Sequence, residues 1–189
     1  MYYADLRDAL ETLGALLASR GQHYDVVVIG GGALLLLGLI DRPTRDLDIV
    51  SRIDGERWLE GEPMPVPLAA AIAEVGRALD LADDWLNAGP TDLLRFGLPP
   101  GFSERVVSHH YAGLTVRLAS RVDQVAFKLY AAVDQGPRSK HFKDLQRLTP
   151  GREELLASAR WCRTHDTSEG FWDMLVQALA LLGVEDPDV

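Results

Sequence analysis

Leucines recur at helical spacing near the start of the chain. Over residues 4–20 they lie three or four positions apart and form one apolar face. Gly21 follows, and a glycine directly after a periodic stretch often ends a helix. The pattern therefore predicts an amphipathic helix over residues 4–20. Its apolar face consists of Leu6, Leu10, Leu13, Leu16 and Leu17.

A run of β-branched residues comes next. "DVVVIG" (25–30) has no polar interruption after its first residue, which predicts a strand buried on both faces. The short apolar stretch that starts at Gly32 predicts a buried helix, and Pro43 ends it. "RDLDIV" (45–50) alternates charged and apolar residues, which predicts a second strand.

The rest of the chain divides into loops, one hairpin and several helices. Residues 54–67 are rich in Gly and Pro and predict a loop, and residues 82–102 predict irregular structure. A hairpin is expected to turn at Ala112-Gly113, and Ser120 with Asp123 predicts a capping box for the next helix. Thr149-Pro150 predicts an N-cap followed by a first-turn proline. The expected helices are 68–79, 121–134, a short one within 135–148, 151–164 and 168–182.

This order of elements predicts an α+β fold. Strands mixed with helices occupy the first part and helices alone occupy the last, whereas a parallel-sheet enzyme would alternate the two throughout. We expect an α+β core with a small mixed sheet over residues 1–119. A helical C-terminal region, residues 120–189, is expected to pack on it.

Composition narrows the class of protein. The 189 residues carry a net charge of −9, which argues against binding nucleic acid through the whole surface. The single cysteine, Cys162, excludes an intramolecular disulfide and fits a reducing compartment. The N-terminus has no signal-peptide pattern, and the longest apolar run is far below the ~20 residues of a membrane span. We therefore expect a soluble cytoplasmic protein with no membrane partner.

Two aspartates at alternate positions are the first candidates for chemistry. On a strand, Asp46 and Asp48 would share a face while Leu47 and Ile49 point into the core. Adjacent carboxylates repel each other unless a cation lies between them, and Mg²⁺ prefers such oxygen ligands. The alternative is a solvated strand end in an acidic protein.

Three consecutive glycines lie between the first strand and its helix. Gly30, Gly31 and Gly32 would let a phosphate approach the backbone closely, although a tight turn alone is the simpler explanation. A dinucleotide fingerprint requires a glycine where this chain has Leu35, and the chain contains no Walker A sequence. Neither familiar phosphate motif fits.

A third arrangement fits better. The stretch "GGGALLLLGLIDRPTRDLD" resembles the signature of the DNA polymerase β-type nucleotidyltransferase superfamily, a glycine pair after a strand followed by Arg-x-Thr-x-Asp-x-Asp. Arg42, Thr44, Asp46 and Asp48 occupy the matching places. The later stretch "KLYAAVDQGPRSKHFKDL" is similar to a second motif of small bacterial nucleotidyltransferase-like proteins that include the AbiEii and MenT toxins. The resemblance covers about residues 26–148.

The resemblance implies transfer of a nucleoside monophosphate from a nucleoside triphosphate to a tRNA or protein acceptor. It also implies a toxin that is paired with an antitoxin protein. Asp46 and Asp48 would hold Mg²⁺, Lys128 would pair with the triphosphate, and Asp144 would orient Lys128 or touch the nucleotide. The residues implied in phosphate, nucleotide or acceptor binding are Gly31, Gly32, Arg42, Thr44, Arg138, Lys140 and Lys143.

Local charge is consistent with this implication. From Arg117 to Arg147 there are seven Lys or Arg against three Asp, a local charge of +4 in an acidic chain. Such a patch would hold a triphosphate or an RNA end. A purely structural explanation remains for each residue. Lys128 would lie on a solvated helix face, and Asp144 would be an intrahelical partner of Lys140 or Arg147.

Two departures from the resemblance leave other functions open. The strand expected to carry a third carboxylate offers Thr115 and Arg117, with His109 and His110 on its partner strand. The place of a second aspartate in the last motif is taken by Arg147. A nucleotide- or partner-binding module without turnover is therefore one alternative. A Rossmann-type dinucleotide binder is another.

Overall fold

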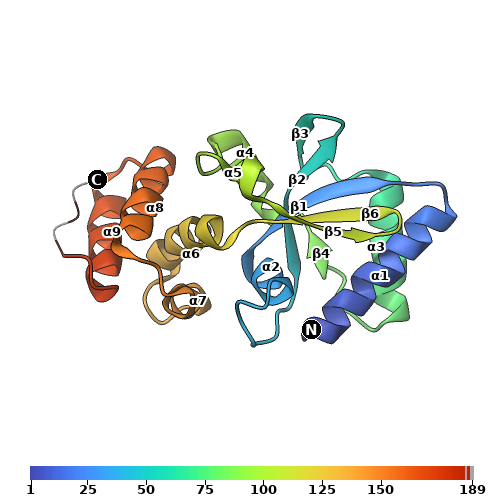
Figure 1. Cartoon of the computed structure of the whole chain (residues 1–189), viewed down its shortest axis with the longest axis horizontal. Helices are drawn as coiled ribbons and strands as arrows, with labels where there is room; N and C mark the ends of the chain where they lie inside the picture. Colours follow the sequence, from blue (N-terminus) through green and yellow to red (C-terminus); the bar gives the residue numbers. More distant parts are fainter. Residues whose placement is uncertain (186, 188–189) are drawn as a thin grey trace. The chain divides into compact units, whose positions relative to one another are not determined.

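The N-terminal half of the chain forms a mixed six-stranded sheet (Figure 1). The computed structural model describes residues 1–185 and 187. The sheet has the order β3-β2-β1-β6-β5, with β4 paired to β2; β1–β6 and β2–β4 are parallel and the other pairs are antiparallel. The strands are β1 (Tyr24–Ile29), β2 (Leu47–Asp54), β3 (Arg57–Glu60), β4 (Leu86–Asn87), β5 (Val107–Tyr111) and β6 (Leu114–Leu118).

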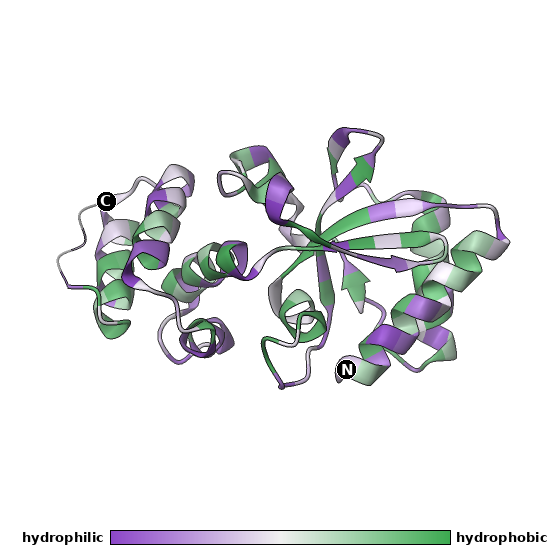
Figure 2. Ribbon diagram, in the orientation of Figure 1, coloured by the Kyte–Doolittle hydropathy of each residue, from purple (hydrophilic) through white to green (hydrophobic). Residues whose placement is uncertain are grey.

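Helix α1 (Tyr3–Ser19) confirms the amphipathic helix predicted at the start of the chain. Its apolar face is fully buried at Leu6, Leu10, Leu13 and Leu17, and it contacts β5, β6 and α3 (Val66–Ala78). Figure 2 shows strongly hydrophilic residues on the same helix. Burying each leucine is worth about 1.5–3 kcal/mol, so this face holds α1 on the sheet.

Four shorter helical segments complete this half. They are α2 (Gly30–Leu36), η1 (Gly89–Thr91), α4 (Asp92–Phe96) and α5 (Phe102–Arg105). Because β1 and β2 are antiparallel, the strand–helix–strand unit around α2 is not a parallel βαβ crossover. A dinucleotide-binding Rossmann unit requires that crossover, so this alternative is excluded.

The C-terminal half is helical, as the order of elements predicts. Its helices are α6 (Arg121–Gln135), α7 (Lys140–Leu148), α8 (Arg152–His165) and α9 (Glu169–Leu181). Helix α6 contacts the other three. Edge-to-face aromatic pairs join α6 to α8, with Phe127 and Trp161 ring centroids 5.4 Å apart.

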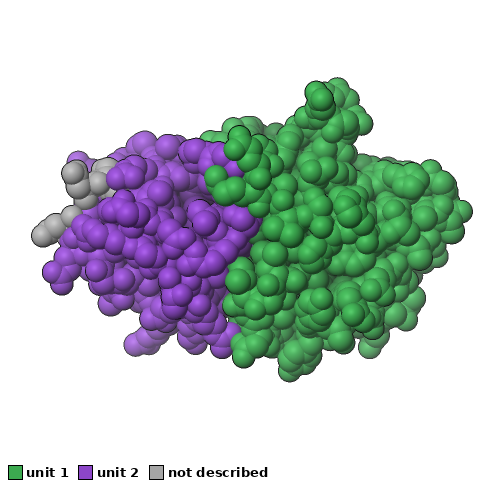
Figure 3. All heavy atoms as spheres, viewed as in Figure 1, with its two compact units in different colours: residues 1–98, 103–119 green, residues 99–102, 120–189 purple. Residues whose placement is uncertain are grey.

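The chain divides into two compact units (Figure 3). Unit 1 comprises Met1–Leu98 and Ser103–Ala119, and unit 2 comprises Pro99–Phe102 and Ser120–Val189. The sheet lies in unit 1 and helices α6 to α9 lie in unit 2. The α+β class with a mixed sheet followed by helices is thus confirmed. No helix within the described residues has the length and apolarity needed to cross a membrane.

Three local predictions were wrong. Residues 82–102 were expected to be irregular, yet they contain β4, η1, α4 and the start of α5. Residues 54–67 were expected to be a loop, yet residues 57–60 form β3, because Gly55 at φ +63° allows a tight hairpin turn after Asp54. Thr149 was expected to cap α8, yet it ends α7 in the left-handed conformation. Gly151 is the N-cap instead, because Glu154 lies three residues later and accepts the Gly151 N–H at 2.9 Å.

Cys162 lies in the core of unit 2. It is fully buried on α8, where Sγ donates to the Ala126 carbonyl at 3.9 Å. Burial raises the pKa of its thiol far above the ordinary value. Because the thiolate is the reactive form, we expect a disulfide reagent to modify Cys162 at least a hundredfold more slowly in the native protein than in urea. Equal rates in buffer and urea would show that this part of the core opens readily.

Candidate functional site

The three glycines form the first turn of α2, two residues earlier than the helix start expected at Gly32. Gly30 has φ +81°, a conformation that favours glycine. A Cβ at Gly30 would lie 2.8 Å from Asp48 Oδ2, closer than real Cβ atoms approach an oxygen. The turn and the Asp48 carboxylate therefore touch, with no room for a side chain between them.

The other two glycines meet the segment that precedes β2. A Cβ at Gly31 would lie 3.2 Å from Thr44 Oγ1 and 3.3 Å from Arg42 Nη2. At Gly32 it would lie 2.5 Å from Leu47 Cδ1, so this glycine is needed for close helix–strand packing. Close approach thus accounts for Gly30 and Gly32, whereas the neighbours of Gly31 are the ends of two side chains that could shift by a few tenths of an ångström.

Burial alternates around the two aspartates. Leu47 and Ile49 are fully buried, whereas Asp46 and Asp48 are half-buried, which is the alternation expected from the sequence. Asp46 comes just before β2, and its carbonyl accepts a hydrogen bond from buried Thr44 Oγ1 at 3.0 Å. Asp48 is in register with Ile29, the last residue of β1.

Asp48 lies between two strands, β1 on one side and β4 on the other. The parallel pairing of β4 with β2 places Leu86 opposite Leu47 and Asn87 opposite Asp48. The sequence pointed instead to the strand 114–118, which pairs with the other edge of β1. Asn87 lies in a segment that was expected to be irregular, and no motif pointed to it. The polar residue in register with Asp48 is therefore an asparagine that sequence reasoning missed.

Two polar side chains of β6, Arg117 and Thr115, interact with residues of neighbouring strands. Arg117 makes a two-pronged ion pair with Asp25 at 2.6–3.0 Å, and this hydrogen bonding raises the pKa of the Arg117 guanidinium. Thr115 Oγ1 lies 3.2 Å from His110 Nδ1 on the neighbouring strand. None of these contacts involves Asp46 or Asp48.

The donor set at Asp46 and Asp48 suits a hard divalent cation. Across residues 1–185 and 187, no cluster of three or more His, Cys, Asp or Glu side chains could hold a metal. Mg²⁺ needs no such cluster, because it binds one or two carboxylates and completes its shell with waters and substrate phosphates. Two half-buried carboxylates beside a turn that lacks side chains fit that requirement.

Unit 2 contains a buried ion pair. Lys128 Nζ on α6 and Asp144 Oδ2 on α7 are 2.8 Å apart, and their side chains are 3% and 0% exposed. Lys128 therefore does not belong to a solvated helix face, and Asp144 has a partner on a neighbouring helix. Arg138, Lys140 and Lys143 are exposed around the start of α7. The predicted residues thus form two groups, the glycines with the aspartates in unit 1 and this pair with its basic neighbours in unit 2.

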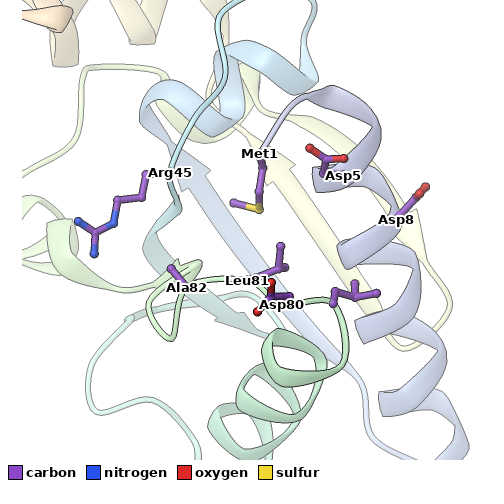
Figure 4. A pocket seen from close by; sticks show the side chains of 8 residues that line it. Met1, Asp5, Asp8, Arg45, Asp80, Leu81 and Ala82 are labelled. Carbon is purple, nitrogen blue, oxygen red and sulfur yellow. The ribbon is translucent and has the colours of Figure 1, made fainter.

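A cavity of about 510 Å³ in unit 1 is a separate feature (Figure 4). Asp5 and Asp8 of α1 border it together with Asp80, and Arg45 is the only basic side chain among its described lining residues. Arg45 also binds Asp84, at 3.0 Å. Repulsion by three carboxylates makes this cavity a poor site for a triphosphate.

A comparison of the chain with known protein families, with curated proteins and with solved structures finds no match.

Proposed function

We propose that the chain is a Mg²⁺-dependent nucleotidyltransferase of the polymerase β type. It would move a nucleoside monophosphate from a nucleoside triphosphate to a tRNA or protein acceptor, as the toxin of a toxin–antitoxin pair. The observation that carries this proposal is the contact between Gly30 and Asp48, where a Cβ would lie 2.8 Å from the carboxylate. A phosphate that lies on this turn is thereby brought next to the carboxylates that would hold its cation.

The reaction is a single in-line displacement. The acceptor oxygen bonds to the α-phosphorus, the bond from this phosphorus to the bridging oxygen breaks, and pyrophosphate leaves while the acceptor proton passes to solvent. Mg²⁺ held by Asp46 and Asp48 would neutralise the charge of the triphosphate. Arg42, whose guanidinium lies over Gly31, would donate to the phosphates there.

The resemblance assigns a role in phosphate binding to Lys128, which the structure pairs with Asp144. Asp144 holds the Lys128 ammonium at 2.8 Å, so it restricts where the amine lies before a nucleotide binds. The exposed Arg138 and Lys143 would contact the nucleotide or the acceptor. In a protein of net charge −9, such a local basic group attracts phosphate without binding nucleic acid over the whole surface.

The direct test is nucleotide transfer by purified protein. Each of the four α-³²P-labelled nucleoside triphosphates is incubated with Mg²⁺ and with total tRNA or a protein extract. We expect transfer of at least one of them, and we expect EDTA to abolish it. Asp48→Asn should lower transfer at least a hundredfold, because one of two carboxylates for the cation is lost.

Asp54→Asn is the matched control. Asp54 lies at the exposed end of the same strand, where it pairs with Arg57, so the variant makes the same charge change away from the glycines. Its transfer activity and its melting temperature should equal those of the wild type. Absence of transfer from all four labelled nucleotides to either acceptor would refute the enzymatic function.

A second candidate function is nucleotide binding without turnover. Asn87, next to Asp48, is an amide and cannot accept a proton as a general base at neutral pH. This candidate predicts that the protein binds a nucleoside triphosphate with Mg²⁺ in calorimetry and transfers nothing. The same labelled assay therefore separates the two functions.

A further inference from the structure

Asn87 is the only asparagine in the chain, and it lies beside Asp48. In a parallel pair, residues in register point to the same face of the sheet. Burial agrees with this rule: Leu47 and Leu86 are buried together, and Asp48 and Asn87 are both half-buried. The Asn87 amide and the Asp48 carboxylate therefore occupy neighbouring positions on one face.

Two backbone contacts fix the orientation of the Asn87 amide. Oδ1 accepts the N–H of Gly89 at 2.8 Å, and Nδ2 donates to the Asp84 carbonyl at 3.1 Å. Each contact uses half of the capacity of its atom, because an amide oxygen has two lone pairs and an amide nitrogen two hydrogens. The side chain is thus held in place and still has one donor and one acceptor for a ligand.

Solvent reaches Asn87. It borders a surface cavity of about 420 Å³ in unit 1, whose described lining includes neither Asp46 nor Asp48. Strand β4 is only two residues long and pairs with β2 at Asp48 itself. A molecule bound at the aspartates would therefore have the Asn87 amide at its side.

We propose that Asn87 is the third polar side chain of the cation site, an inference that rests on the proposed function. It would contribute a neutral amide group beside the cation that Asp46 and Asp48 would hold. The site then carries two negative charges, which suits one divalent cation that shares its remaining coordination with phosphate oxygens. The acceptor loses its proton to solvent, since an amide cannot take it.

Binding of Mn²⁺ alone tests this assignment without any measurement of turnover. Free Mn²⁺ is counted by electron paramagnetic resonance during titration of the full chain. Asn87→Asp adds a charge beside Asp48, so we expect about tenfold tighter binding. Asn87→Ala removes the amide and should weaken binding about threefold. Gln177→Glu, on the exposed surface of α9, makes the same charge change elsewhere and should leave binding unchanged.

The outcomes separate this proposal from the function on which it rests. Tighter Mn²⁺ binding by Asn87→Asp together with weaker binding by Asn87→Ala supports the assignment. If Asn87→Asp does not fold, the Mn²⁺ affinity of Asn87→Ala decides. If Asp48→Asn weakens Mn²⁺ binding while both Asn87 variants bind as the wild type does, Asn87 is not part of the site and the proposed function stands. If neither the wild type nor any variant binds Mn²⁺, the assignment of Asn87 to a cation site of the free protein is wrong, and the labelled transfer assay alone decides the proposed function.

Discussion

Replacing Lys128 with alanine is expected to destabilise unit 2 by about 3–5 kcal/mol, because it leaves a buried carboxylate without its charge partner. Asp144 is fully buried and lies 2.8 Å from the Lys128 ammonium. Asp144 then loses the ammonium charge that offsets the cost of its lost hydration. The midpoint of urea unfolding, followed by circular dichroism, measures the effect.

The double variant Lys128→Met/Asp144→Leu is the control for this prediction. It removes both charges and fills the space with apolar atoms, and such replacements of buried ion pairs are often neutral or stabilising. We expect its unfolding free energy to be within about 1 kcal/mol of that of the wild type. A double variant as unstable as Lys128→Ala would mean that packing, and not an unpaired charge, causes the loss.

The same double variant separates a role of the ion pair in stability from a role in nucleotide binding. If Lys128 pairs with the triphosphate, the folded double variant should lose nucleotide binding, measured by calorimetry with a nucleoside triphosphate and Mg²⁺. If it is folded and binds as tightly as the wild type, the Lys128–Asp144 pair stabilises the helices and has no role in the proposed reaction. The single variant cannot make this distinction, because loss of folding alone would abolish its activity.

The sequence predicted well those elements whose residue pattern lies within one short segment of the chain. Burial repeats every three or four residues along α1 and at every second residue around Asp48, so the chain itself shows which side faces the core. The hairpin turn at Ala112-Gly113 lies between two adjacent strands and is equally local. Strand β3 was missed because Gly and Pro in residues 54–67 predicted a loop, although Asp54-Gly55 is also a hairpin signal.

The neighbour of Asp48 could not be predicted in this way. Strand β4 has two residues and therefore no periodicity, and α3 separates it from β2 in the sequence. Only the completed sheet shows that Asn87 is in register with Asp48. The ion pair of Lys128 and Asp144 is a similar case: the sequence placed both residues in one motif, and only the packing of α6 on α7 shows that they form a buried pair.

Replacing Gly14 with alanine is expected to destabilise unit 1 by roughly 3 kcal/mol or more, although alanine is the better helix former. Gly14 lies within α1, where a Cβ would lie 1.8 Å from the Tyr111 carbonyl oxygen. Gly113 N–H also donates to the Gly14 carbonyl at 3.0 Å, so α1 is held directly on the β5–β6 hairpin. A methyl group would have to push a whole helix away from backbone atoms.

Gly170 provides the matched substitution, because it lies in α9 and a Cβ there would meet nothing within 4 Å. Gly170→Ala should stabilise unit 2 by about 0.5–1 kcal/mol, since only the helix preference and the lower entropy of the unfolded chain change. The same replacement is thus expected to have opposite signs at two helical positions, which urea unfolding of the two variants measures. If Gly14→Ala also stabilised the protein, α1 could not lie as close to the hairpin as this fold requires.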